Sequence, residues 1–140
     1  MQRIVVIGGV AAGLKAAAKV RRLDAEAQIT VLERGELVSY GACGLPYFIG
    51  GEVEQVRQLM SSPSGTLRTP EFFKKAKNLD VLTRMEAVAI EREAKIVHAL
   101  DLKTGAKRQF AYDKLVLATG SSPIKPAWPG VEKENIFFFF

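Results

Sequence analysis

The stretch IVVIGGVAAGLKAAAKVRRL, residues 4–23, decides the fold. Residues 4–7 form a β-branched apolar run that stops at two glycines, as a strand buried on both faces does. Residues 11–23 are mostly strong helix formers without proline. A second apolar run follows at 29–32. Strand, glycine turn, helix and strand within about thirty residues predict a βαβ unit with parallel strands.

The glycines of this turn match a dinucleotide-binding fingerprint at two of its three positions. The fingerprint needs glycine first, third and sixth, which here are Gly8, Val10 and Gly13. Gly8 can make the tight turn, Gly13 allows close packing of helix on strand, and the helix N-terminus offers N–H groups to a pyrophosphate. Glu33 ends the second strand, where a carboxylate can accept ribose hydroxyls. The pattern predicts dinucleotide binding; a purely structural glycine turn is the alternative.

The remainder of the chain predicts an inserted group of antiparallel strands. Residues 61–70 are a loop by composition, and a helix follows over 70–77 with Thr69 as its N-cap. Short strands are predicted at 81–82, 87–90, 96–100, 109–112 and 115–118, with a turn at 103–105. We therefore predict an α/β, Rossmann-like domain over residues 1–140, with a parallel sheet and an inserted antiparallel β excursion.

Composition limits the class of protein. The 140 residues are 48% apolar and 25% charged, as in soluble globular domains, and no apolar run is long enough to span a membrane. A single cysteine allows no internal disulfide, which predicts a reducing, cytoplasmic setting. The net charge of +5 has three interpretations: a surface for nucleic acid, a surface for a phosphate-rich small molecule, or a solvated helix face. No metal site is predicted.

The only cysteine, Cys43, lies in LVSYGACGLPYFIGG, residues 37–51. It is either a small apolar residue in a turn or a reactive thiol. The following Gly44-Leu45-Pro46 predicts a sharp turn into a helix, and a helix N-terminus stabilises a thiolate. The loop after Glu33 should place Cys43 above the carboxyl edge of the sheet, where ligands of α/β proteins bind.

Three segments carry a resemblance to a known family: IVVIGGVAAGLKAAAKVRRL, LERGELVSYGACGLPYFIGG and YDKLVLATGSSPIKPAWPGVE. In this order, over nearly the whole chain, they resemble flavin-dependent pyridine nucleotide–disulfide oxidoreductases. The most similar branch has one cysteine and contains coenzyme A-disulfide, persulfide and polysulfide reductases, NADH oxidases and NADH peroxidases. The resemblance implies a Rossmann-like FAD-binding domain, with NADH or NADPH as the reductant, bound by a domain outside this chain. The implied FAD-binding positions are Gly8, Gly9, Val10, Ala11, Ala12, Gly13, Glu33, Arg34, Ala87, Thr119 and Gly120.

Departures from the family pattern favour one branch. Phe48 occupies the position of the second cysteine of dithiol members, so Cys43 must exchange with an external partner. Ala11 occupies the position of the histidine found in peroxidases and oxidases, and the only histidine, His98, lies in the antiparallel excursion. Both departures argue against peroxide chemistry.

The first helix supports a coenzyme A substrate. Lys15, Lys19 and Arg22 follow each other at i, i+4 and i+7, on one helix face. The resemblance implies that coenzyme A contacts these positions and also Ser39, Ala42 and Lys77. Ala42 replaces an asparagine often found there, so its contact would be through the backbone or lost. The alternative is a solvated cationic face.

The expected function is FAD- and NAD(P)H-dependent reduction of coenzyme A disulfide, a persulfide or a polysulfide through Cys43. Members of the family continue into an NAD(P)H-binding domain and a dimerisation domain, so we expect a truncated portion of a homodimeric enzyme, with the run at 137–140 as a truncation point or irregular ending. The alternatives are an NADH oxidase or peroxidase, and a non-catalytic nucleotide- or coenzyme A-binding fragment. Nucleic-acid binding is not expected, because no aromatic residues interleave with the basic row.

Overall fold

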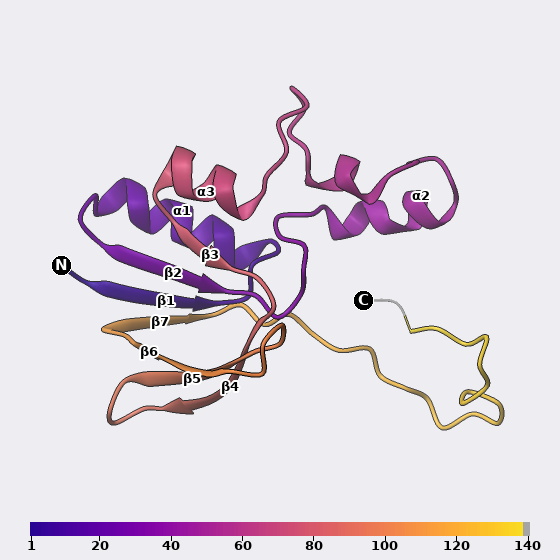
Figure 1. Cartoon of the computed structure of the whole chain (residues 1–140). Helices are drawn as coiled ribbons and strands as arrows, with labels where there is room; N and C mark the ends of the chain where they lie inside the picture. The colour runs from indigo at the N-terminus through magenta and orange to yellow at the C-terminus, as the bar shows by residue number, and fades with distance from the viewer. Residues whose placement is uncertain (139–140) are drawn as a thin grey trace.

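The computed structural model describes residues 1–138 and contains two sheets (Figure 1). The parallel sheet has the order β3-β2-β1-β7, and the antiparallel sheet has the order β4-β5-β6. The elements in chain order are β1 (Arg3–Ile7), α1 (Ala12–Leu23), β2 (Gln28–Leu32), η1 (Ala42–Gly44), α2 (Leu45–Ile49), η2 (Val56–Met60), α3 (Pro70–Lys77), β3 (Asp80–Leu82), β4 (Met85–Glu91), β5 (Ile96–Asp101), β6 (Lys107–Ala111) and β7 (Lys114–Leu117). The predicted α/β class with an antiparallel excursion is confirmed.

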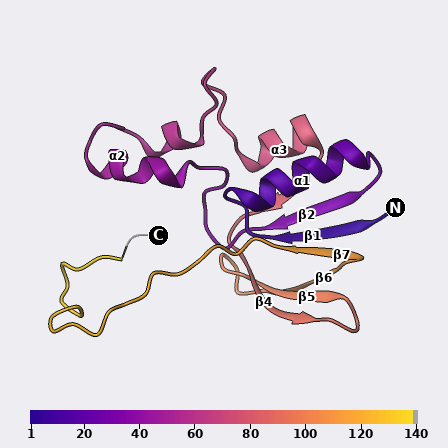
Figure 2. The same ribbon diagram turned by 180° about the vertical axis from the view of Figure 1, so that it is seen from behind.

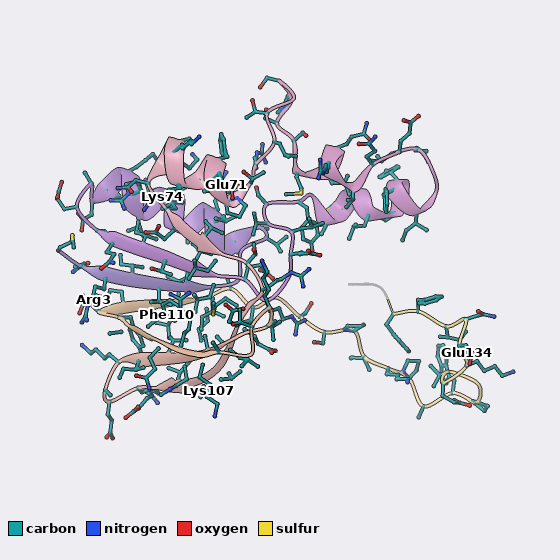
Figure 3. All side chains as sticks on the ribbon, in the orientation of Figure 1. Arg3, Glu71, Lys74, Lys107, Phe110 and Glu134 are labelled. Atoms are coloured by element: carbon teal, nitrogen blue, oxygen red, sulfur yellow. The ribbon has the colours of Figure 1, made fainter. Side chains whose placement is uncertain are left out.

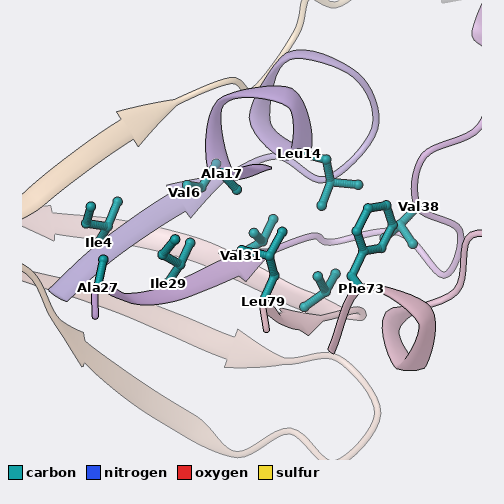
Figure 4. Close-up of a cluster of buried hydrophobic side chains, with 11 residues drawn as sticks. Ile4, Val6, Leu14, Ala17, Ala27, Ile29, Val31, Val38, Phe73 and Leu79 are labelled. Atoms are coloured by element: carbon teal, nitrogen blue, oxygen red, sulfur yellow. The ribbon is translucent and has the colours of Figure 1, made fainter. Parts of the chain in front are cut away.

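Helices α1 and α3 cover one face of the parallel sheet. Leu14 and Ala17 of α1 and Phe73 of α3 pack in one buried cluster with alternate side chains of β1 and β2 (Figure 4). Each helix presents one apolar side to this cluster and leaves its polar side in water, which is the pattern expected of helices that cover a sheet. The predicted N-cap of α3 is confirmed, because Thr69 Oγ1 accepts the N–H of Phe72 at 3.2 Å.

The antiparallel sheet covers the opposite face (Figure 2). Val5, Ile7 and Leu32 point to this side and form a second buried cluster with Met85, Val97, Ala99 and Tyr112. Strands β1 and β2 are therefore buried from both sides, which explains their continuous apolar runs.

Several predicted strand boundaries were wrong by one or two residues. Tyr112 was expected in a strand but follows β6; its N–H is bonded to the carbonyl of Lys95 at 2.9 Å, and its side chain is buried. Ala118 donates to the carbonyl of Ile7 at 2.8 Å, but β7 ends one residue earlier because the chain then leaves the sheet. Strand β4 begins at Met85, two residues before the expected start.

Two segments extend from this core beyond the carboxyl edge of the parallel strands. One contains η1, α2 and η2, and the other is the C-terminal segment after β7, which has no helix or strand in its described part (Figure 1). The C-terminal segment exposes Ile124, Trp128 and Phe137. The predicted irregular ending at 137–140 lies partly outside the described residues, since these stop at Phe138. Within residues 1–138, no helix has both the length and the apolar character needed to cross a membrane.

Candidate active site

The glycine turn between β1 and α1 leaves no room for side chains at two positions. Gly8 has a φ of +110°, and a Cβ built there would lie 2.1 Å from the carbonyl oxygen of Ala118. A Cβ at Gly13 would lie 1.9 Å from the carbonyl oxygen of Gly8. The turn, the start of α1 and the segment after β7 therefore meet backbone to backbone, the close approach that the fingerprint glycines were predicted to provide.

The N-terminus of α1 has no side-chain cap. Ala11 occupies the N-cap position without a side-chain hydrogen bond, and the first turn contains no acidic residue. Ala11 and Ala12 are exposed, and Val10 is half-buried. Amide groups without side-chain acceptors at the positive end of a helix dipole suit an anionic ligand such as a pyrophosphate.

Glu33 is buried beside the glycine turn. Its Oε2 accepts the N–H of Gly9 at 2.7 Å, and its Oε1 accepts the N–H of Gly35 at 2.7 Å. The residue as a whole is 9% exposed. An ionised carboxylate has about four acceptor sites, so one that accepts two backbone N–H groups can still accept a hydroxyl. The sequence did not predict that this acid holds the turn.

The other predicted cofactor positions lie in different places. Thr119 and Gly120 are exposed directly after β7, and Thr119 N would lie 3.4 Å from a Cβ at Gly8. Arg34 is exposed at the end of β2. Ala87 is half-buried in β4 of the antiparallel sheet and packs on the second core cluster. The structure thus brings the glycine turn and the segment of Thr119 and Gly120 together at the carboxyl edge of the parallel sheet. It places Ala87 on the separate antiparallel sheet.

Cys43 is exposed in the middle of η1, directly before α2. The turn packs on η2: Gly41 N donates to Leu59 O at 2.9 Å, and a Cβ at Gly44 would lie 2.4 Å from Leu59 Cδ2. Gly44 is the N-cap residue of α2 and Pro46 is in its first turn, so the predicted turn into a helix is confirmed.

A backbone bond joins the cysteine segment to the glycine turn. Ser39 has a left-handed φ of +54°, and its N–H donates to the carbonyl of Gly9 at 3.0 Å. Gly9 therefore accepts from Ser39 and donates to Glu33, and Val38, which precedes Ser39, is fully buried. The segment that carries Cys43 starts from a fixed point at the turn.

The predicted cationic positions divide between two helices. Lys15, Lys19 and Arg22 are exposed on α1, and Lys77 is half-buried in the last turn of α3. In the part of the chain that the structure describes, none of the four forms an ion pair within 4.0 Å. The other two predicted contacts, Ser39 (half-buried) and Ala42 (exposed), belong to the cysteine segment.

Other features lie away from this edge. A hollow of about 230 Å³ lies at the amino edge of the sheet between β1, β2 and β6, with Arg3 and Phe110 in its lining. Both side chains are labelled in Figure 3. His98 lies on β5, where its Nε2 is 3.3 Å from Glu91 Oε2. Among residues 1–138, no three His, Cys, Asp or Glu side chains are grouped as ligands of one metal ion.

Comparison with known proteins places this arrangement in a family. The sequence profile described as pyridine nucleotide-disulphide oxidoreductase matches residues 2–140. A coenzyme A disulfide reductase from Staphylococcus aureus (strain Newman) is 39% identical over 122 residues, which are 87% of this chain and 26% of that protein. This chain therefore spans about a quarter of the length of the curated relatives it matches.

Two solved structures show the same fold. An NAD-dependent persulfide reductase from A. fulgidus superposes with a TM-score of 0.88 at 48% identity, over 94% of this chain and 24% of that one. A water-forming NADH oxidase from Lactobacillus brevis superposes with a TM-score of 0.81 at 30% identity, over 96% of this chain and 28% of that one.

Proposed function

This chain belongs to the pyridine nucleotide-disulphide oxidoreductase family. On this premise we propose that it is part of an FAD-dependent, NAD(P)H-dependent enzyme that reduces coenzyme A disulfide, a persulfide or a polysulfide. The observation that carries the proposal is the exposed Cys43 in a short turn, whose segment is bonded to the glycine turn through Ser39 and Gly9. The similarity to a coenzyme A disulfide reductase and to a persulfide reductase supports the choice of substrates.

The glycine turn suits the pyrophosphate of FAD. Gly8 and Gly13 let the turn, the start of α1 and the segment after β7 pack backbone to backbone. The start of α1 offers N–H groups, and Glu33 offers acceptors for a ribose. Thr119 and Gly120 complete the proposed contacts from the other side of the turn. Bound there, FAD would supply the transfer of two electrons from NAD(P)H to sulfur.

Cys43 would perform the sulfur chemistry. Its thiolate attacks one sulfur of coenzyme A disulfide, a Cys43–sulfur bond forms, and one coenzyme A thiolate leaves. Two electrons then cleave the mixed disulfide, which restores the Cys43 thiolate and releases the second coenzyme A thiolate. With a persulfide, the Cys43 thiolate attacks the outer sulfur, the S–S bond of the substrate breaks, and its thiolate leaves. Two electrons then cleave the Cys43 persulfide, which restores the Cys43 thiolate and releases hydrosulfide. Since Cys43 is the only cysteine of these 140 residues, no second thiol within them can resolve the intermediate.

The exchange step can be tested on the chain itself. Incubation with coenzyme A disulfide should add the mass of one coenzyme A, removable by dithiothreitol, and Cys43→Ser should abolish the adduct while flavin binding is unchanged. Glutathione disulfide at the same concentration is the matched control and should react more slowly. Equal rates with both disulfides would contradict a coenzyme A site. Reductase activity retained by Cys43→Ser in the full-length protein would contradict the role of the thiol.

An NADH oxidase is the second candidate, because such an enzyme has the same fold at 30% identity. Ala11 and His98 argue against it: position 11 offers no titratable side chain, and the imidazole lies on the antiparallel sheet. Oxygen uptake that exceeds disulfide reduction with NADH would favour the oxidase.

A coenzyme A- or nucleotide-binding fragment without redox activity is a third candidate, of a different class. A purified chain without flavin absorbance after incubation with FAD would favour it over the enzyme. The proposal for the reductase also includes a cytoplasmic setting and a homodimer of the full-length protein, which sedimentation of that protein tests.

A further inference from the structure

Arg21 joins the C-terminal ends of the two helices that cover the parallel sheet. Its Nη1 donates to the carbonyls of Asp24, at 3.3 Å, and Ala25. Its Nη2 donates to the carbonyls of Ala27, at 2.6 Å, and Asn78, at 3.0 Å. The first three acceptors lie in the turn after α1, and Asn78 is the C-cap residue of α3. Arg21 thus donates a hydrogen bond to Asn78, a residue 57 positions further along the chain.

The charge of Arg21 acts on both helix ends. Each helix C-terminus carries roughly half a negative charge from its dipole. One guanidinium placed against the carbonyls at both ends therefore offsets about one negative charge. The last turns of the two helices also carry Arg22 and Lys77, so this offset adds to a positively charged corner.

Two of the six proposed coenzyme A contacts are direct neighbours of this link in the sequence. Arg22 follows Arg21 directly, and Lys77 precedes Asn78 directly. Figures 1 and 2 both show α1 and α3 side by side over the sheet. We propose that Arg21 is a positioning residue of the coenzyme A site, which holds Arg22 and Lys77 in register for one phosphate group by linking the two helix ends. The inference rests on the proposed function.

A purely structural role for Arg21 makes a different prediction. If Arg21 only stabilises the fold, its substitution lowers the melting temperature, and the effect of a second substitution at Lys77 on binding is unchanged. If Arg21 positions Lys77, the two substitutions are coupled. Lysine at position 21 keeps the charge, but its single ammonium cannot reproduce the fork that reaches both helix ends.

The experiment is a double-mutant cycle with coenzyme A as the titrated ligand. The wild type, Arg21→Lys, Lys77→Met and the double variant are titrated by calorimetry, below the melting temperature of each. We expect Arg21→Lys to weaken binding about fivefold or more, and Lys77→Met to weaken it several-fold in the wild type and by less than twofold in Arg21→Lys. Arg92→Lys, in the exposed turn between β4 and β5, is the matched control and should bind like the wild type.

Two results would overturn this inference but leave the proposed function standing. One is an affinity of Arg21→Lys for coenzyme A equal to that of the wild type; the other is the same loss of affinity from Lys77→Met in the wild type and in Arg21→Lys. A wild-type chain that does not bind coenzyme A would overturn the coenzyme A part of the proposed function and this inference with it. A second measurement does not need the Arg21 variant to fold. On addition of coenzyme A, the nitrogen-15 chemical shift of Arg21 Nε should change in the wild type and remain unchanged in Lys77→Met. The signal of Arg92 Nε is the reference and should not change in either protein. An unchanged Arg21 signal in the wild type would also overturn the inference.

Discussion

Glu33 Oε2 accepts the backbone N–H of Gly9 at 2.7 Å, so the acid predicted to bind a ribose also fixes the turn predicted to bind the pyrophosphate. Its other oxygen accepts the N–H of Gly35 at 2.7 Å. The carbonyl of Gly9 in turn accepts from Ser39, at the start of the segment that carries Cys43. The two halves of the candidate site therefore share one buried carboxylate as their anchor.

Replacing Glu33 with Gln should destabilise the protein. The amide keeps one acceptor oxygen, but its NH₂ group faces a backbone N–H and leaves a buried donor unpaired. We expect the free energy of unfolding in urea to fall by about 1–3 kcal/mol. The exposed Glu26→Gln is the control and should change it by less than about 0.5 kcal/mol. Equal values for the two variants would show that the Glu33 bonds do not hold the turn.

Replacing Gly13 with Ala has two opposite effects on stability, one from helix propensity and one from steric overlap. Propensity alone predicts a gain of about 1 kcal/mol, because alanine is the better helix former. The new Cβ would lie 1.9 Å from the carbonyl oxygen of Gly8, so we expect a loss of about 1–3 kcal/mol instead. The Cβ of Gly41→Ala would meet nothing closer than Leu59 O at 3.7 Å, and this control should be nearly neutral. A stabilised Gly13→Ala in urea denaturation would contradict the geometry of the turn.

The pair of Arg3 and Asp113 should make stability depend on acid pH. Hydrogen bonds from the Arg3 side chain and then from its backbone N–H lower the pKa of Asp113 from 3.8 to about 2. The stabilisation is therefore complete above the ordinary value of 3.8 and is lost as pH falls through about 2. In thermal unfolding, the wild type should have a higher melting temperature than Asp113→Asn above this interval, and the difference in melting temperature should shrink as pH falls through it. The difference between the wild type and Arg3→Gln should shrink in the same way. A difference in melting temperature between the wild type and Asp113→Asn that stays the same at every pH would contradict the pairing.

Removal of the Thr69 hydroxyl should weaken α3. Thr69→Ala loses the acceptor for the N–H of Phe72, which should lower the free energy of unfolding by about 1 kcal/mol. Thr69→Ser retains an acceptor oxygen and should recover most of the loss. A serine variant as unstable as the alanine variant would mean that the methyl group, and not the cap, is responsible.

Neutralising Lys19 should weaken coenzyme A binding without affecting the fold. An exposed ion contact contributes about 0.2–1 kcal/mol, so Lys19→Gln should weaken binding up to about fivefold, and less at high salt. Lys103→Gln, in the turn after β5, carries the same change of net charge and should leave the affinity unchanged. Equal losses from the two variants would indicate a general charge effect and not a contact.

Local signals made much of the fold predictable. The buried strand, the glycine turn and the helix formers of residues 4–23 act within a few residues of one another, and Thr69 precedes its own helix directly. The strand boundaries were less certain, because the ends of a ladder depend on the partner strand. Met85 belongs to β4 because Asp101 lies opposite it and because its N–H donates to the carbonyl of Glu33.

The contacts of Arg21 could not be predicted from its neighbours in the sequence. Three of its acceptors follow within six residues, but the fourth is on another helix, and only the packing of both helices on the sheet brings it close. The same holds for Ser39, whose left-handed backbone has no glycine to signal it. Its conformation is supported by the bond to Gly9, which forms only when the loop has folded onto the turn.

The pairing of β7 with β1 determines when the carboxyl edge beside the glycine turn can form during synthesis. Arg3 and Asp113 are 110 positions apart, and a ribosome adds about 5–20 residues per second, so the outer edge of β1 waits roughly 5–20 seconds for its partner. The backbone that packs against Gly8, at Ala118, is added 110 positions after Gly8 itself. A nascent chain that stalls before position 114 presents an open, apolar strand edge, the surface on which chains aggregate and to which chaperones bind.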